Sequence, residues 1–222
     1  MASVPPERTT RDRIVDASIA LFNSEGVDGT SVVAIGERAG VATGNLTYYF
    51  PRKRDIVFEI LDRFETSIDE LQSGLLADIV TGTKSVTPAE TVTLLACITR
   101  VIWRNRFFFS STMALHRLDK AIPARFTKIE ARARNGISQL IQKTLDGGVL
   151  TPLRYPNTVQ HLAENIWYLL WGCMFFQRIR AASAEALEAD VVHSTLMHLA
   201  ALIEPHIARE FSIAVCDEIN KL

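Results

Sequence analysis

Apolar residues recur along most of this chain at the spacing of one face of an α-helix. The first clear run occupies positions i, i+3, i+7 and i+8: Ile14, Ala17, Leu21 and Phe22. Gly26 follows this run and is a natural left-handed stop for a helix. We therefore expect a first helix from about residue 11 to residue 25, preceded by an irregular arm over residues 1–9.

The same periodicity, together with Ser, Thr, Gly and Pro at the expected boundaries, predicts helices along the rest of the chain. Alternating strand patterns bounded by turn residues are absent. The stretch 81–87 is predicted to be a linker, and the tail to form a short terminal helix. The further helices are expected at about 30–38, 43–50, 51–78, 88–102, 105–118, 123–145, 157–179 and 183–203.

This pattern predicts an all-α fold with two parts. The first three short helices fit an N-terminal helix-turn-helix domain over residues 1–55. The longer helices that follow fit a C-terminal helical bundle over residues 56–222. A chain of 222 residues with 48% apolar residues is long enough to bury such a core.

The third predicted helix has a surface suited to DNA. Within its sequence TGNLTYYF, Leu46 and Phe50 are four residues apart and face inward, with Tyr49 at the edge of that face. The outward positions carry short hydrogen-bonding groups, one bare backbone position and one aromatic ring: Thr43, Gly44, Asn45, Thr47 and Tyr48. A helix that reads the major groove needs donors and acceptors for base edges and little bulk.

A basic cluster follows at once, at the start of the fourth predicted helix. Arg52, Lys53 and Arg54 lie in its first turn, where cations oppose the helix dipole. A phosphate docked there would remove the conflict. Because the formal net charge is only −1, DNA contact must come from such a local cluster, and a non-specific nucleoid-type binder is disfavoured.

The segment from Thr30 to Val57, with residues 14–26 before it, resembles the DNA-binding domain of TetR-family regulators. The resemblance covers about 50 residues and includes the Ala39-Gly40-Val41 turn and the Gly-x-Leu-x-Tyr-x-Phe core of the third helix. Gly36, Ala42 and Thr47 depart from the family pattern. The resemblance implies that nine residues contact the DNA groove or its phosphates: Thr30, Ser31, Thr43, Gly44, Asn45, Thr47, Tyr48, Tyr49 and Lys53.

The second half is rich in aromatic side chains, each of which has a place in an ordinary helical core. The resemblance adds that this domain usually encloses a site for a hydrophobic effector. The residues expected to line it are Trp103, Phe107, Met113, His116, Trp167, Trp171 and Phe175, with Asn165 and Gln177 as further polar candidates.

We expect a homodimer, because two-fold pairing matches palindromic operator DNA. The predicted helices at 157–179 and 183–203 are long enough to form an intermolecular four-helix bundle. Its expected seam is Leu187, Val191, Leu196, Leu199 and Ile203.

The remaining patterns exclude several other classes. The histidine and cysteine spacings fit no metal site, no cofactor motif is found, and neither a nucleophile elbow nor a phosphate loop marks an enzyme. The longest apolar stretch, 166–176, is too short to span a membrane. We expect a cytoplasmic repressor that leaves its operator when an effector binds. The alternatives are a regulator without a small-molecule effector, and an enzyme or carrier with an incidental helix-turn-helix.

Overall fold

The computed structural model describes residues 8–71, 73, 87–154, 156–181 and 188–222, with the side chains of 177–181 excepted. Within these ranges every regular element is a helix, apart from one isolated β-bridge between Leu150 and Ile207. The predicted all-α fold is therefore confirmed. The chain forms two compact units: Met1–Phe64 with Asn105–Ala124, and Glu65–Arg104 with Arg125–Leu222.

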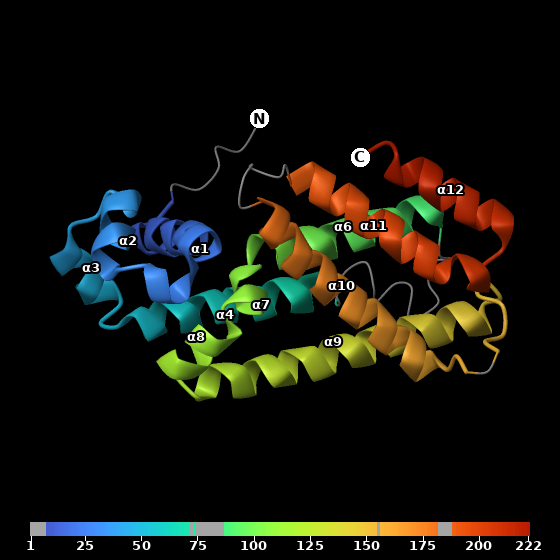
Figure 1. The fold of residues 1–222 in the computed structure, drawn as a ribbon, viewed down its shortest axis with the longest axis horizontal. Helices are drawn as coiled ribbons and strands as arrows, with labels where there is room; N and C mark the ends of the chain where they lie inside the picture. Colours follow the sequence, from blue (N-terminus) through green and yellow to red (C-terminus); the bar gives the residue numbers. More distant parts are fainter. Residues whose placement is uncertain (1–7, 72, 74–86, 155, 182–187) are drawn as a thin grey trace. The chain divides into compact units, whose positions relative to one another are not determined.

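The first unit holds the helices of the N-terminal segment and a later excursion of the chain (Figure 1). A long helix, α4, carries residues of both units. The helices concerned are α1 (Thr10–Gly29), α2 (Val32–Ala39), α3 (Thr43–Tyr49), α4 (Lys53–Leu71), α7 (Phe107–Ser110) and α8 (Thr112–Leu118). The predicted extension of α4 to residue 78 lies outside the described residues.

Helix α1 begins with a capping box and continues further than expected. The Thr9 hydroxyl accepts from the Asp12 backbone N–H, and the Asp12 carboxylate accepts from the Thr9 backbone N–H. Gly26 does adopt a positive φ, of 79°, but one more helical turn follows it, to Gly29. Gly26 is therefore non-helical and interrupts the helix next to the expected end at residue 25, and the short turn beyond this kink was not predicted.

The later excursion completes the core of the first unit. The Phe107 ring packs against Phe22 of α1 with ring centroids 5.3 Å apart, and it packs against Phe108 at 4.2 Å. The Phe107 backbone N–H donates to the side-chain oxygen of buried Asn23, at 3.0 Å. These contacts make residues 107 and 108 part of the same hydrophobic core as α1.

The single helix predicted over 105–118 is two helices in the structure. Ser111 has φ −110° and ψ 23°, which ends α7 and begins α8. Three consecutive aromatic residues, 107–109, are all buried. All three lie in α7, where successive side chains are about 100° apart, so this short helix is buried on more than one side.

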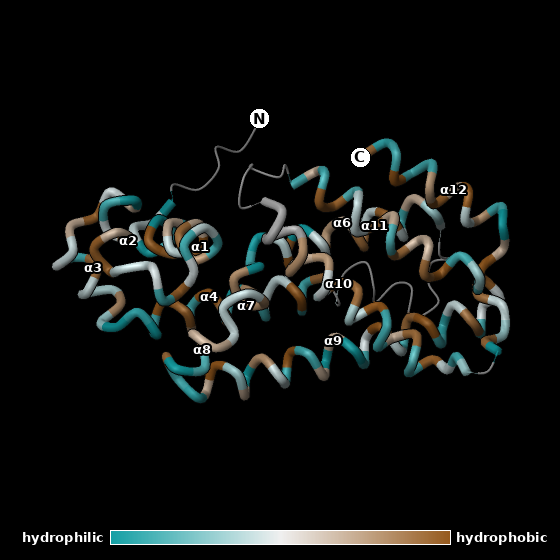
Figure 2. Tube along the Cα trace, viewed as in Figure 1, coloured by the Kyte–Doolittle hydropathy of each residue, from teal (hydrophilic) through white to brown (hydrophobic). Residues whose placement is uncertain are grey.

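The second unit consists of longer helices. They are α6 (Pro88–Arg104), α9 (Ala121–Asp146, whose first turn belongs to the first unit), α10 (Val159–Ala181), α11 (Glu188–Ile203) and α12 (Arg209–Ile219), with a 3₁₀ turn at Glu204–His206. Helices α6, α11 and α12 pack on one another around Val92, Ala96, Val192, Leu196, Val215 and Ile219. Figure 2 shows hydrophobic and hydrophilic stretches alternating along α11 and α12.

This core corrects the predicted dimer seam. Val191, Leu196 and Leu199 are buried within the chain, and Ile203 packs against a second core cluster around Ile141. Leu187, the remaining member, lies outside the described residues. The periodicity of α11 was read correctly as one apolar face, but that face covers the core of its own chain.

Candidate nucleic-acid interface

The turn between α2 and α3 is held by backbone hydrogen bonds. Ser31 caps α2, since its hydroxyl accepts from the Ala34 backbone N–H at 3.0 Å. At the other end Gly40 has φ 64°, a left-handed conformation that favours glycine, and the Val41 N–H donates to the Gly36 carbonyl at 2.9 Å. The turn thus closes tightly over the last turn of α2.

Gly36 allows this close approach of the turn to α2. A Cβ atom at this position would lie 2.8 Å from the Val41 carbonyl oxygen, and backbone atoms cannot move aside cheaply. Propensity alone treats a glycine inside α2 as a loss of up to about 1 kcal/mol relative to alanine. The structure shows that the missing side chain makes room for the turn.

Helix α3 separates its two faces as the sequence predicts. Leu46 is 0% exposed and Phe50, just after the helix, is buried, whereas the five outward residues at 43, 44, 45, 47 and 48 are all exposed. Ala42 occupies the N-cap and supplies no side-chain bond, and Thr43 does not take over that role. A Cβ added at Gly44 would meet no atom within 4 Å. The outward face of α3 is therefore open over Gly44.

Two large side chains add to this exposed surface. Tyr48 is 81% exposed and stacks edge-on against half-buried Tyr49, with ring centroids 5.6 Å apart. On α2, Val33 is an exposed aliphatic residue that we did not predict as part of the site. The sequence could have indicated Val33, because it is a large apolar residue on the polar side of α2, one helical turn before Glu37.

Lys53 has a structural role in the unbound chain. Its ammonium donates to the carbonyl oxygens of Val27, at 2.7 Å, and Thr30, at 2.9 Å. These bonds tie the start of α4 to the corner between α1 and α2. An ammonium has three donors, so one N–H remains for a phosphate. The predicted phosphate contact of Lys53 stays a prediction.

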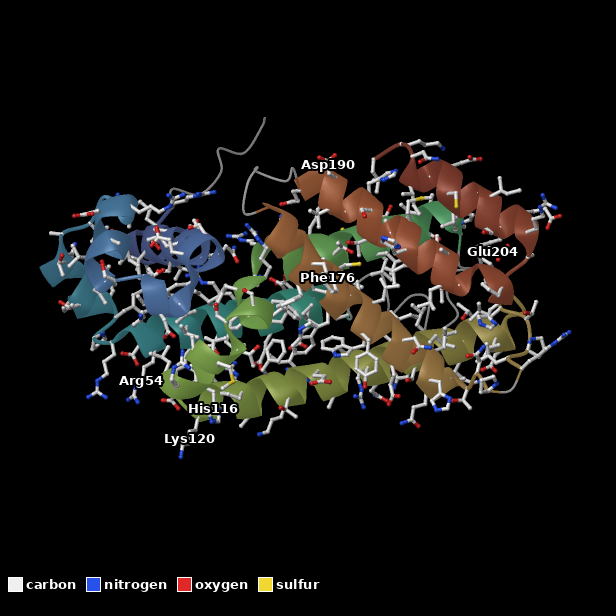
Figure 3. All side chains as sticks on the ribbon, viewed as in Figure 1. Arg54, His116, Lys120, Phe176, Asp190 and Glu204 are labelled. Carbon is white, nitrogen blue, oxygen red and sulfur yellow. The ribbon has the colours of Figure 1, made fainter. Side chains whose placement is uncertain are left out.

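The other two residues of the basic cluster, Arg52 and Arg54, differ in their ion pairs. Arg54 pairs with Asp119 at 3.1 Å, whereas Arg52 is exposed and no acidic side chain of the described residues forms an ion pair with it (Arg54 is labelled in Figure 3). Thr30 is buried and its hydroxyl donates to the Gly26 carbonyl. This side chain therefore does not reach the surface, where we predicted that it would contact DNA. Ser31 is the exposed cap, and Arg52 is a phosphate candidate that the prediction omitted.

Ion pairs brace α1 against α4 behind this surface. Glu59 accepts from Arg11 at 2.5 Å and from Arg63 at 2.9 Å, and Arg63 also pairs with Asp12. The Arg11 guanidinium, followed by that of Arg63, holds the pKa of Glu59 below its usual value. The network therefore keeps Glu59 charged to lower pH than an isolated glutamate and links the two helices that support α3.

Comparison with known proteins identifies the chain. Residues 14–60 match the profile "Bacterial regulatory proteins, tetR family", and residues 75–214, more than half of the chain, match "Bacterial transcriptional repressor" of the same family. The chain belongs to the TetR family. Both profiles describe regulators, so the family is one of transcriptional regulators and not of enzymes.

Individual TetR-family proteins resemble the chain in two ways. The HTH-type transcriptional regulator AcrR of Shigella flexneri and the repressor KstR of Mycolicibacterium smegmatis are each 38% identical over 63 residues, which is 28% of this chain and 29% and 31% of theirs. These matches thus span less than a third of either relative. A TetR-family regulator from Marinobacter aquaeolei VT8 shares the fold, with a TM-score of 0.79 at 22% identity over 96% of this chain and 98% of that one.

The seven residues predicted to line an effector site in this TetR-family chain fall in both units. Phe107, Met113 and His116 belong to the first unit, and Trp103, Trp167, Trp171 and Phe175 to the second. Phe107 is core, packed on Phe22. Met113, His116 (labelled in Figure 3) and Phe175 are exposed, so these three do not line an enclosed pocket within their own unit. Asn165 is exposed as well, and the side chain of Gln177 lies outside the description.

The tryptophans of the second unit are less exposed than Phe175. Trp103 and Trp167 are buried, and Trp171 is half-buried. Trp167 meets Trp171 edge-on at 5.9 Å, and Trp171 meets Phe126 of α9 edge-on at 5.8 Å. The Trp167 Nε1–H is buried and has no acceptor among the described residues. An unsatisfied buried donor costs about 1–3 kcal/mol.

Across the described residues, no three His, Cys, Asp or Glu side chains are grouped so that they could hold a metal ion. Likewise, no helix in that part of the chain is long and apolar enough to cross a membrane.

Proposed function

We propose that this TetR-family protein is a homodimeric repressor that binds double-stranded operator DNA through α3 and releases it when a hydrophobic effector binds. The outward face of α3 carries the proposal. Its exposed side chains are hydrogen-bonding groups on a helix whose opposite side is anchored by buried Leu46. A rigid helix with such a face matches the base edges of the major groove.

The residues around α3 supply the contacts that position it. Asn45 and Thr47 are suited to base edges, and Tyr49, Lys53 and the capped N-terminus at Ser31 to phosphates. Arg52 adds an exposed cation at the same edge. Its charge is local, which agrees with the near-zero net charge of the whole chain.

The dimer is proposed to form through the exposed face of α10. Tyr168, Phe175 and Phe176 are large apolar residues exposed on this helix, and their spacing places them on one side of it with Gly172 between them (Phe176 is labelled in Figure 3). A Cβ at Gly172 would meet nothing within 4 Å, so the backbone is open to close approach. An apolar face of this kind marks an interface, and a second copy is the occupant that palindromic DNA requires.

The effector is proposed to bind at the tryptophan cluster of the second unit. α4 continues from Lys53, beside α3 in the sequence, into residues of the second unit. A ligand that prefers the form not bound to DNA by about 100-fold shifts the equilibrium by roughly 2.7 kcal/mol. A tilt of α4 is the proposed route. The alternative is a regulator of the same family without a small-molecule effector.

The proposal is tested by selecting operator sequences from random duplex DNA with the full-length protein and then measuring binding to variants of the selected site. We expect a palindromic operator, and we expect Asn45→Ala to relax preference at one position in each half-site by about 1–3 kcal/mol. Ser24→Ala, an exposed change on α1, is the control. A selection without any preferred sequence contradicts the proposal, and a uniform loss over all operator variants contradicts base reading by Asn45.

The basic residues are separated by the salt dependence of operator binding. Lys53→Ala and Arg52→Ala are each expected to weaken binding to all DNA alike and to lower the salt slope by about one unit, because each contacts a phosphate. Only Lys53→Ala is expected to lower the free energy of unfolding, by roughly 1–3 kcal/mol, because it removes the bonds to Val27 and Thr30. Anisotropy titrations at four salt concentrations and urea unfolding measure both effects. An unchanged slope for a variant removes that residue from the phosphate contacts.

A further inference from the structure

We propose that the unpaired indole N–H of Trp167 is the hydrogen-bond donor that holds the effector, and that the effector is an uncharged apolar molecule with a carbonyl or ether oxygen. The inference rests on the proposed function, in which an effector binds the second unit. It adds the chemical class of the ligand and the residue that selects it.

The first step is that Trp167 offers a donor for which the fold provides no acceptor. Trp167 is only 6% exposed, and its Nε1 has no hydrogen-bond partner in the part of the chain that the structure describes. Buried indole N–H groups normally have a partner, and a group without one calls for an explanation. The only other such side-chain atom among the described residues, Thr195 Oγ1, lies beside the Cys173 thiol, a weak hydrogen-bonding group.

The second step is the polarity of the surroundings. The rings that meet around Trp167 are those of Trp171 and, one contact further on, Phe126. The buried residues on the same side of α10 are Ala163, Leu170 and Met174. The one charged neighbour at helical spacing, Glu164, already pairs with Arg134. A charged ligand would lose its hydration among these apolar groups and would have to compete with that ion pair, so a neutral ligand is favoured.

The third step is the direction of the hydrogen bond. An indole nitrogen donates and cannot accept, so the ligand must bring the acceptor. Ketones, esters, lactones and ethers satisfy this requirement, whereas hydrocarbons and protonated amines do not. Trp171, which is half-buried, places one ring of the cluster at the protein surface, where a ligand arrives from solvent.

The test uses three probes on one bicyclic skeleton: 1-tetralone, which has a carbonyl, tetralin, which has none, and 1-aminotetralin, which is a cation at pH 7. Binding to the full-length dimer is measured by calorimetry. We expect 1-tetralone to bind about 3- to 10-fold more tightly than tetralin, and 1-aminotetralin to bind more weakly than both. Equal affinities for the ketone and the hydrocarbon, or no binding of 1-tetralone up to its solubility, overturn the inference.

Two changes at Trp167 connect the preference to its N–H. Trp167→Phe is expected to abolish the preference for the ketone. Because this change also removes ring volume, a second protein carries 3-benzothienylalanine at position 167, in which sulfur replaces the N–H and the bicyclic ring remains. It is expected to lose the ketone preference and to keep or raise the melting temperature. A retained preference, or a lowered melting temperature, shows that the N–H already has a partner and overturns the inference.

Operator binding distinguishes this inference from the function on which it rests. The ligand-free parent protein is expected to bind the selected operator, and this measurement does not depend on the probes. A protein that binds no operator refutes the proposed function, whatever the probes show. Tetralone binding with the expected preference but without operator release supports the ligand class and contradicts only the release step.

Discussion

Replacing Gly44 with alanine should make the protein more stable and nearly unable to bind its operator. The added Cβ meets no atom within 4 Å, and alanine is favoured over glycine in a helix by about 0.5–1 kcal/mol, so the folded state gains. In the proposed complex the same methyl group would face the DNA. The helix must then withdraw, and base contacts worth about 1–3 kcal/mol each are lost, so affinity falls on the order of 100-fold.

Gly36→Ala is the matched control for this experiment. It makes the same chemical change in the neighbouring helix, but its Cβ would overlap the Val41 carbonyl at 2.8 Å, so stability should fall by about 1–3 kcal/mol instead of rising. Urea unfolding and anisotropy with the selected operator measure both variants. If Gly44→Ala binds the operator as well as the parent protein, α3 does not approach DNA through this face.

Phe176→Arg should convert the protein into a monomer with little operator affinity. The Phe176 side chain is 61% exposed in the single chain, so the arginine is tolerated there, but in the proposed dimer it would bury a charge among aromatic rings. A monomer reads one half-site only. We expect the affinity to fall by about 10³-fold or more, towards the level of non-specific binding.

An exposed apolar residue on another helix gives the control. Ile213→Arg places the same charge on α12, whose side chain at that position is also more than half exposed. Sedimentation equilibrium should show a dimer for Ile213→Arg and a monomer for Phe176→Arg. The free energy of unfolding of the monomeric chain should be equal for the two variants. A dimeric Phe176→Arg protein rules out this face of α10 as the interface.

Local patterns in the sequence were sufficient to predict α2 and α3. The spacing of Leu46 and Phe50 identified the buried side of α3, and Gly40 identified the end of α2, because both signals act within a few residues. Contacts between distant residues were not accessible in this way. The bond from Lys53 to Val27 depends on how α4 meets the α1–α2 corner, and no local rule encodes that meeting.

The second unit shows the same limit more strongly. An apolar stripe such as that of α11 indicates that something covers it, but not whether the cover is another helix of the chain or a second copy. Aromatic residues are equally ambiguous in both units, since Phe107 of the first unit is core, whereas in the second unit Phe175 is exposed and Trp167 is buried with an unpaired donor. Composition alone does not separate these three outcomes, because burial and partner depend on the tertiary packing around each position.

The discontinuous first unit bears on how this protein can be recombined with its relatives. A chimera joined after residue 55 would carry Phe22 and Asn23 into a foreign second half, without the Phe107 ring and backbone N–H that they contact here. The transplanted N-terminal segment would then have a gap in its core, and the Asn23 amide oxygen would lack its hydrogen-bond donor. A chimera that also carries residues 105–124 keeps both partners, so the portable module in this chain consists of two separate segments.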